Sequence, residues 1–233
     1  MLYQLSHVRV HPYLSNRDLL PTSPFVGIDV GAARLHVVAL DDAGGVTVAE
    51  VVDAGELPAL VARLVSARQI AIDSPDRWST APHAGNTSLS PKFRLARCAE
   101  IGLARARRVW VPWTTPVSAD AAPGWIRTGV ALFAALRAVG HEPLEVYPYA
   151  AYRVLNSGGR LAEKRSAGGR QQRRELLVAA GVDAHGLDRL TTHDLRDAAV
   201  AAVVARDHAH GHATPATCGH DGSAIWLPAS PPS

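Results

Sequence analysis

Hydrophobic residues in the first part of the chain form three short runs that turn signals separate. The runs lie at 25–30, 35–40 and 46–52, with Gly31 after the first and the turn sequence DDAGG after the second. Glycine-containing breaks of this length join antiparallel strands. The segment therefore predicts three consecutive antiparallel strands.

The pattern then changes to that of a helix followed by a buried strand. Apolar residues recur at helical spacing over 56–67, and the apolar run at 69–75 ends in proline. A polar loop rich in proline, serine and threonine follows at 75–91, and a loop of this length is often functional. Further along, the same patterns predict helices at 92–107, 122–140 and 191–206 and a helix in the second half of 159–181. They also predict short strands at 143–148 and 223–227, and either a short strand or an extended piece at 109–113.

These elements predict one α/β domain over residues 24–228. Three antiparallel strands come first and the later strands alternate with helices. We therefore expect a mixed five-stranded sheet whose later strands are parallel, with helices on both faces. Residues 1–23 are polar and mixed, and we expect a loosely attached, disordered extension there. The last residues, 229–233, are expected to form a disordered tail.

Composition favours a folded domain and weakly favours anionic partners. The chain has 233 residues, 47% of them hydrophobic, and a net charge of +3. No apolar run approaches the roughly 18 residues of a membrane span, and the N-terminus lacks a signal-peptide pattern. The two cysteines, Cys98 and Cys218, lie far apart without metal-type spacing and are expected to be reduced thiols. A cytoplasmic protein is therefore expected.

Three acidic residues interrupt apolar strand sequences. Asp29 lies inside VGIDVG, Asp73 ends IAID, and Glu145 lies in LEV. A carboxylate in a buried strand costs free energy unless it is paired or coordinated, and the ends of buried strands are where α/β proteins place their sites. Each acid taken alone is equally well explained as a loop cap or as the partner of an arginine.

Two further acids, Asp194 and Asp197, stand at the head of a helix rich in alanine and valine. Taken alone they fit a capping role, because Thr191 is a candidate N-cap and negative charge stabilises a helix N-terminus. Helical spacing also places both acids on one face with small residues that let a helix approach a sheet closely: Ala198, Ala201, Ala202 and Ala205. If that face meets the sheet edge near Asp29 and Asp73, the carboxylates gather, and Mg²⁺ or Mn²⁺ would offset their repulsion. Two such ions about 4 Å apart can stabilise the attacking and leaving oxygens in phosphodiester cleavage.

This layout resembles the RNase H-like superfamily, in which acids stand on the first strand, on the fourth strand and on a late helix. The stretch HDLRDAAVAA is similar to the last helix of RuvC-type Holliday-junction resolvases. Over 25–228 the chain resembles domain of unknown function family 429, described as predicted RNase H-like nucleases. The matching pieces are GIDVGAARLHVVALD, IAIDSP, RLARCAE, TTP, GW, EVYPYAA, GRQQRRELL, HDLRDAAVAA and DGSAIWLP.

The resemblance implies an RNase H-like fold with a metal-dependent, nuclease-like site. Carried over by motif, Asp29, Asp73 and Asp197 would bind one or two Mg²⁺ or Mn²⁺ ions, and Asp194 would be an additional or alternative ligand. Glu145 has no counterpart in the superfamily triad and is a second-tier candidate acid.

One histidine and two basic segments complete the candidate site. His193, beside Asp194, is a candidate for positioning a water or protonating a leaving group, or else a helix-start residue without chemistry. The basic segments suit a phosphodiester substrate, although a charge run is as readily a solvated surface. The predicted nucleic-acid-binding residues are Lys92, Arg94, Lys164, Arg165, Arg170, Arg173 and Arg174.

A histidine-rich segment near the C-terminus invites a zinc interpretation that its spacing does not support. Glycine and proline separate its members, which fit no tetrahedral template. A flexible polar loop is therefore expected there. The members are His208, His210, His212, Cys218 and His220.

The sequence thus predicts a Mg²⁺- or Mn²⁺-dependent endonuclease that acts on DNA or RNA, and two alternatives stay open. One is a non-catalytic RNase H-like domain that binds nucleic acid or a partner through its basic surface. The other is an actin-like or sugar-kinase-like ATPase. The stretch GIDVGAARLHVVALD resembles the first phosphate loop of such proteins. Against the ATPase, IDSP has no glycine after its acid and no convincing adenosine motif is present.

Overall fold

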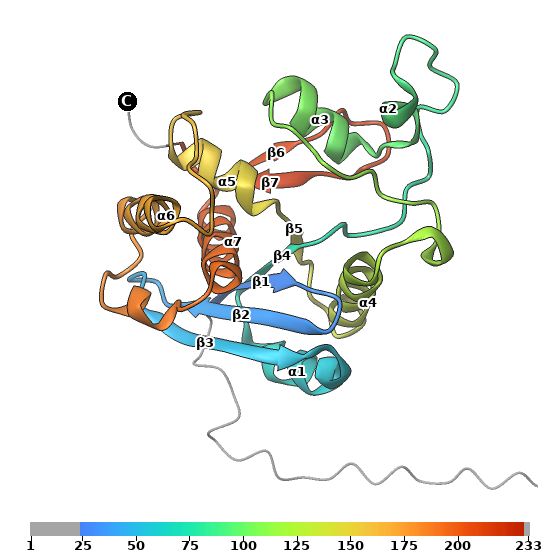
Figure 1. Ribbon diagram of the computed structural model, residues 1–233. Coiled ribbons are helices and arrows are strands. Elements are labelled where there is room, and N and C mark those ends of the chain that lie inside the picture. Colours follow the sequence, from blue (N-terminus) through green and yellow to red (C-terminus); the bar gives the residue numbers. More distant parts are fainter. Residues whose placement is uncertain (1–23, 231–233) are drawn as a thin grey trace, which may run out of the picture.

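A computed structural model describes residues 24–230 of the chain (Figure 1). The extension predicted at 1–23 and the last three residues of the predicted tail lie outside the described residues. The strands are β1 (Phe25–Val30), β2 (Arg34–Leu40), β3 (Val46–Asp53), β4 (Gln69–Asp73), β5 (Leu144–Glu145), β6 (Thr214–Ala216) and β7 (Ile225–Leu227). The α-helices are α1 (Leu57–Arg63), α2 (Pro91–Leu95), α3 (Cys98–Ala106), α4 (Gly124–Ala138), α5 (Pro148–Leu155), α6 (Ala167–Ala179) and α7 (His193–Ala209).

The main sheet has five strands in the order β3-β2-β1-β4-β5. β1 pairs antiparallel with β2 and parallel with β4, β2 pairs antiparallel with β3, and β4 pairs parallel with β5. The predicted mixed sheet is therefore confirmed, including its antiparallel meander. The strand predicted at 143–148 is shorter than expected, because Pro148 already opens α5, a helix that the sequence pattern did not indicate.

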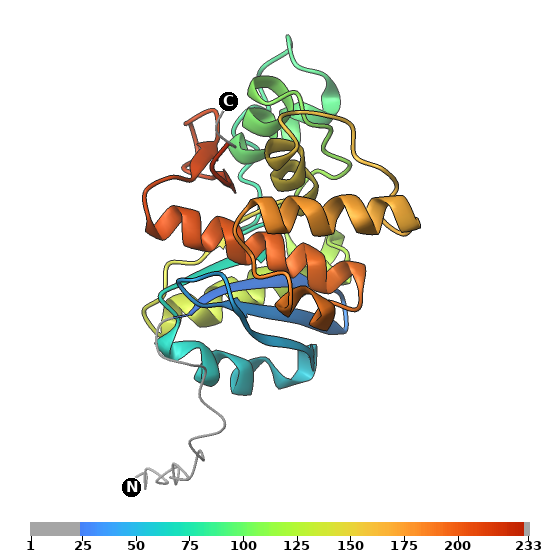
Figure 2. The ribbon, with the colours of Figure 1, turned by 90° about the vertical axis from the view of Figure 1, so that its left-hand side faces the viewer.

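Helices cover both faces of this sheet, as expected (Figures 1 and 2). On one face α7 lies against β1, β2 and β4, with α5 and α6 packed against it. On the other face α1 and α4 enclose a second apolar core. Because side chains alternate along a strand, β1 contributes Phe25 to the α7 side and Val26 and Ile28 to the α1 and α4 side.

The helix α7 approaches β1 at Gly27 closely enough to exclude a side chain. A Cβ atom at Gly27 would stand 2.0 Å from the Ala198 carbonyl oxygen and 2.3 Å from the Ala202 backbone nitrogen. The alanine face predicted from helical spacing is therefore the face that meets the sheet. Although α7 is rich in alanine and valine, none of the helices within residues 24–230 is long and apolar enough to cross a membrane.

The helix predicted at 92–107 is divided in two. Ala96 is extended after α2, and Arg97 is the N-cap of α3, where its backbone N–H donates to the Glu100 side chain. The helix α3 packs against a small hairpin formed by β6 and β7. Of the two possibilities for 109–113, a short strand or an extended piece, the structure shows the extended piece, without strand pairing in the described chain.

Two expectations, one about the cysteines and one about the histidine-rich segment, are wrong. Cys98 and Cys218, expected to be separate reduced thiols, form a disulfide that joins α3 to the segment after β6, with Cα atoms 4.7 Å apart. His208, expected in a flexible loop, lies in the last turn of α7, where its ring packs edge-on against Trp226. Folding brings Cys98 next to Cys218 and His208 next to Trp226, and sequence spacing does not indicate either contact.

We expect Gly27→Ala to lower the free energy of unfolding by about 1–3 kcal/mol or more, the usual cost of overpacking. The added methyl group would collide with backbone atoms of α7, which cannot move aside as a side chain can. Urea unfolding would measure the effect. Gly85→Ala is the matched control, since a Cβ there meets nothing within 4 Å, and an equal loss in both variants would contradict the close contact.

Candidate metal centre at the end of β1 and β4

Asp29 and Asp73 stand side by side at the ends of two parallel strands. They are register partners between β1 and β4, two positions beyond the pair that Gly27 forms with Ala71. Period two places both carboxyl groups on the face of Gly27, which α7 covers. Burial raises the pKa of the Asp73 carboxyl group well above its ordinary value, and the charge of Asp29 raises it further.

Asp197 brings a third carboxylate to this place from the second turn of α7. Its side chain is buried, and burial raises its pKa to about 6 although the Lys164 ammonium group opposes the shift. The Lys164 Nζ lies 3.1 Å from the Asp197 Oδ2. The charge of Asp197 also raises the pKa of Asp73, so the three acids act on one another electrostatically.

His36 joins the cluster from β2, where it is the antiparallel register partner of Asp29. Its Nδ1 lies 3.4 Å from the Asp29 Oδ2, and its Nε2 lies 3.7 Å from the Asp194 Oδ2. These three residues each offer one ligand atom, and the atoms lie within 4.8 Å of one another. Sequence reasoning missed His36, but pairing the predicted hairpin across Gly31 would have placed it opposite Asp29.

The start of α7 differs by one residue from the expected cap. Thr192, rather than Thr191, is the N-cap, and its side-chain oxygen accepts a hydrogen bond from the Leu195 backbone N–H at 3.1 Å. Asp194 therefore lies in the first turn, where the helix dipole favours its charge. His193 Nε2 lies 3.1 Å from the Asp194 Oδ1, and burial lowers the pKa of the His193 imidazole.

A cavity of about 220 Å³ lies beside the carboxylates. Asp73, Asp197 and Lys164 line it together with Tyr147 and other residues of the start of α5. The cavity gives small ligands access to two of the three clustered acids, so the cluster is not enclosed in the core.

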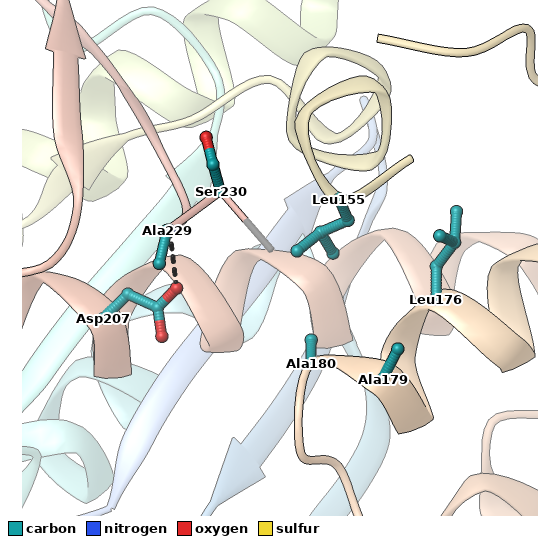
Figure 3. A pocket seen from close by; sticks show the side chains of 7 residues that line it. All are labelled: Leu155, Leu176, Ala179, Ala180, Asp207, Ala229 and Ser230. Atoms are coloured by element: carbon teal, nitrogen blue, oxygen red, sulfur yellow. Dashed lines mark hydrogen bonds between the residues drawn. The ribbon is translucent and has the colours of Figure 1, made fainter. Parts of the chain in front are cut away.

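Another cavity, of about 180 Å³, lies between α5, α6 and the C-terminal end of α7 and has no comparable chemistry (Figure 3). Leucine and alanine side chains form most of its wall. Its charged lining residue, Asp207, already accepts a hydrogen bond from the Ala229 backbone N–H at 2.9 Å. We therefore assign no catalytic role to this cavity.

Glu145 is not brought to the carboxylate cluster. It is the register partner of Ile72, which points to the opposite face of the sheet from Asp73. Its two carboxylate oxygens accept hydrogen bonds from the fully buried Arg97 guanidinium at 2.6 and 2.7 Å. Asp76 and Glu100 complete this ion-pair network, so the arginine-partner interpretation of Glu145 is the one the structure supports.

The predicted basic residues also fall into two groups, those near the carboxylate cluster and those with partners elsewhere. Lys164 lies at the carboxylates, on the α5–α6 loop that continues through Arg165 to the start of α6. Four of the others donate hydrogen bonds to groups elsewhere in the protein. Lys92 donates to the Val111 carbonyl, and Arg94 donates to the carbonyls of Leu89 and Thr87. Arg173 donates to the carbonyls of Ala162 and Gly169, and Arg174 donates to the Asp188 carboxylate and the Ala184 carbonyl. Arg170 likewise donates to the Arg165 carbonyl oxygen. Lys164, Arg165 and Arg170 lie on one segment that leads from the α5–α6 loop into α6, and the remaining residues have structural contacts elsewhere.

A family model described as "Protein of unknown function (DUF429)" matches residues 27–219. The chain belongs to this family. The matched range includes all three clustered acids, Asp29, Asp73 and Asp197, and the family description assigns them no role. Comparisons with curated proteins and with solved structures give no match.

We expect Asp73→Asn to stabilise the metal-free protein by about 0.5–2 kcal/mol, the usual range for removing a local penalty. The raised pKa of Asp73 means that its ionised form is disfavoured in the folded state. That penalty is present at pH 7 and disappears as the pH falls and the folded protein takes up a proton. Thermal unfolding in a chelator at pH 7 and pH 4 should therefore show the larger gain at pH 7, and a loss of stability at pH 7 would contradict this account.

Proposed function

We propose that this protein is a Mg²⁺- or Mn²⁺-dependent nuclease with an RNase H-like fold. The observation that carries the proposal is the convergence of Asp29, Asp73 and Asp197 on one face of the sheet. The strand order, with antiparallel pairing on the β2 side of β1 and parallel pairing on the β4 side, supports the fold assignment. Acids on the first strand, the fourth strand and the last long helix match the layout of that superfamily.

The chemistry of the donor set fits a hard divalent cation. Carboxylate oxygens are the ligands that Mg²⁺ and Mn²⁺ prefer, and a cation would offset the repulsion that raises the pKa of Asp73. Asp29 belongs both to the group with Asp73 and Asp197 and to the group with His36 and Asp194. Asp29 is therefore the residue that both candidate ligand groups have in common.

Bound divalent cations would supply an activated water and would stabilise the charge on the phosphate oxygens. The protein's own residues would hold and orient the substrate. Lys164, Arg165 and Arg170 would contact phosphates from the α5–α6 segment. His193, whose lowered pKa keeps its imidazole neutral near pH 7, could exchange a proton with water or with the leaving oxygen.

A non-catalytic nucleic-acid-binding domain is the second candidate, and one ion pair favours it. Lys164 already lies against Asp197, as expected if the acids serve as structural partners for cations. The Lys164 side chain is 43% exposed and comes from a loop, so a metal ion could displace it without disturbing a helix. In the nuclease candidate Lys164 occupies a position that a metal ion would take, whereas in the non-catalytic candidate it is the structural partner of Asp197.

The nuclease proposal predicts cleavage that depends on Mn²⁺ or Mg²⁺ and on the clustered acids. Purified protein would be incubated with single-stranded, double-stranded, hybrid and branched oligonucleotides, and products separated by gel. Asp29→Asn and Asp197→Asn should each reduce the cleavage rate by at least about 100-fold, because each removes a ligand that positions the reacting groups.

Asp120→Asn, an exposed acid outside the cluster, is the control and should cleave like the wild type. Cleavage activity retained in Asp29→Asn would contradict the assignment of the site. Absence of cleavage by the wild type on every substrate, with nucleic-acid binding intact, would favour the non-catalytic alternative.

Lys164→Met separates the two candidates by metal affinity. If Lys164 occupies a position that a divalent cation would take, its removal should tighten Mn²⁺ binding several-fold and weaken oligonucleotide binding. If instead Lys164 is the structural partner of Asp197, removal leaves a buried carboxylate unpaired and lowers the melting temperature with no gain in Mn²⁺ affinity. Calorimetry and thermal unfolding on the same preparation measure both quantities.

A further inference from the structure

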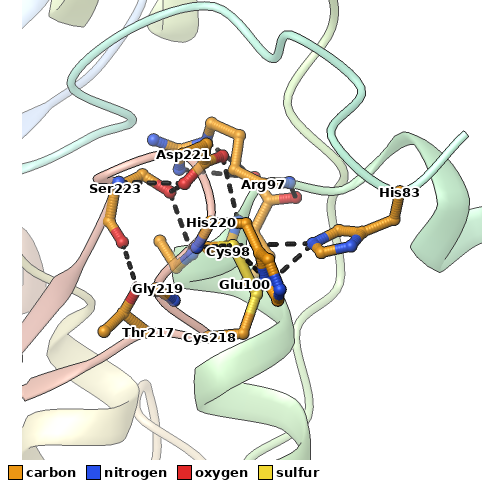
Figure 4. The surroundings of a disulfide bond; sticks show 11 residues. His83, Arg97, Cys98, Glu100, Thr217, Cys218, Gly219, His220, Asp221 and Ser223 are labelled. Carbon is orange, nitrogen blue, oxygen red and sulfur yellow. Dashed lines mark hydrogen bonds and ion pairs between the residues drawn. A yellow bond between two sulfur atoms is a disulfide. The ribbon is translucent and has the colours of Figure 1, made fainter.

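A second group of ligand-type side chains lies in a different part of the molecule, beside α3 (Figure 4). His83 comes from the long loop between β4 and α2, and Cys98 is the first residue of α3. Cys218 and His220 come from the connection between β6 and β7. Three segments that are remote in sequence thus each present a sulfur or imidazole nitrogen to one point.

Three of the sulfur–nitrogen distances between these side chains are close to those of a tetrahedral metal site. All four ligand atoms lie within 4.8 Å of one another. His83 Nε2 is 3.5 Å from the Cys98 Sγ and 3.3 Å from the Cys218 Sγ, and His220 Nδ1 is 3.8 Å from the Cys98 Sγ. Zinc bonded to sulfur at about 2.3 Å and to nitrogen at about 2.0 Å holds the two atoms about 3.5 Å apart.

We propose that His83, Cys98, Cys218 and His220 bind one zinc ion when the Cys98–Cys218 disulfide is reduced. Two thiolates and two imidazoles form a donor set that zinc prefers and that Mg²⁺ and Mn²⁺ do not. Four protein ligands leave no open position, so the site is structural and does not carry out the proposed phosphodiester chemistry. This inference does not rest on the carboxylate site.

The exchange between the two states balances simply. Reduction adds two electrons and two protons to the disulfide and yields two thiols, with a dithiol or phosphine as the reductant. Zinc binding then releases both protons and forms two Zn–S bonds. Breaking the S–S bond also frees the sulfurs to move to the roughly 3.8 Å separation that tetrahedral zinc requires.

Backbone hydrogen bonds hold Cys98 and His220 in place. The His220 backbone N–H donates to the Cys98 Sγ, and the Cys98 backbone N–H donates to the Asp221 carboxylate at 3.1 Å. Cys98 also stands at the N-terminus of α3, where the helix dipole favours negative charge. Hydrogen bonds of this kind orient the ligands of metal sites.

Burial differs among the four positions in a way that suits metal entry. Cys98 is fully buried, whereas the His220 residue is exposed. An ion could therefore reach the sulfurs from the solvent side, where His220 would close the site. The bound ion would tie the 75–91 loop and the β6–β7 connection to α3.

The test uses the full-length chain, reduced with a phosphine and stripped of metal with a chelator. Co²⁺ is added as a spectroscopic probe, and Zn²⁺ is then used to displace it. The proposal predicts one Co²⁺ with the intense visible bands of tetrahedral coordination and a thiolate-to-cobalt charge-transfer band, both abolished by one equivalent of Zn²⁺. The oxidised protein, with its disulfide intact, should give neither band.

Variants locate the ion. Cys218→Ser should remove most of the charge-transfer band, and His220→Ala should weaken zinc binding by more than the roughly 10–100-fold that an outer-shell change costs. Because His220 is exposed, its replacement should leave the fold intact. His212→Ala, an exposed histidine from the same part of the chain, is the matched control. Asp29→Asn should leave this site unchanged.

A folded, reduced protein that binds no Co²⁺, or binds it without a charge-transfer band, would overturn the proposal. Zinc affinity equal in His220→Ala and the wild type would overturn it as well. Since Asp29→Asn acts only on the carboxylate cluster, failure at either site is distinguishable from failure at the other.

Discussion

The backbones of β1 and α7 are in contact, and this contact sets the distance between the helix and the sheet. The candidate site depends on that distance. At Gly27 the absence of a side chain lets the Ala198 and Ala202 turns of α7 rest on the strand. Asp197 immediately precedes Ala198, and Asp29 follows Gly27 by two positions. A larger residue at Gly27 would lift the helix and move its carboxylate away from the two strand acids.

Two charged clusters flank the β4–β5 edge, and their balance of charge differs. On one side Arg97, with Arg77 and Arg137 bound to Asp76, compensates the carboxylates around Glu145. On the α7 side the acids outnumber the nearby ammonium group of Lys164, and the pKa values of Asp73 and Asp197 are raised. A compensated network stabilises a fold, whereas an under-compensated one in reach of a cavity is typical of a functional site.

Local patterns in the sequence were sufficient for the elements that carry strong periodicity. The three-strand meander, β4 and α7 follow from apolar spacing, and the small face of α7 follows from its alanines. These patterns put Asp29, Asp73, Asp194 and Asp197 forward as candidates, and the family resemblance singled out Asp29, Asp73 and Asp197. The Mg²⁺ or Mn²⁺ requirement and the nuclease activity stay proposals.

Features that depend on long-range pairing could not be predicted in this way. His36 required the register of the β1–β2 hairpin, and the break before α3 required the buried partners of Arg97. The approach of Cys98 to Cys218 spans 120 positions, so no spacing rule reaches it. Glu145 is the opposite case. Its position in a predicted strand suggested a site residue, but its side chain lies on the other face of the sheet from Asp73.

The most direct test of the central claim is a calorimetric titration of Mn²⁺ into the wild-type protein and into Asp29→Asn, with Asp120→Asn as the control, in the presence and absence of an oligonucleotide mixture. The account predicts saturable binding to the wild type and to Asp120→Asn that is lost in Asp29→Asn. Mn²⁺ binding that is absent from the wild type under both conditions, or unchanged by Asp29→Asn, would contradict it and would leave the acids as structural partners of Lys164 and His36.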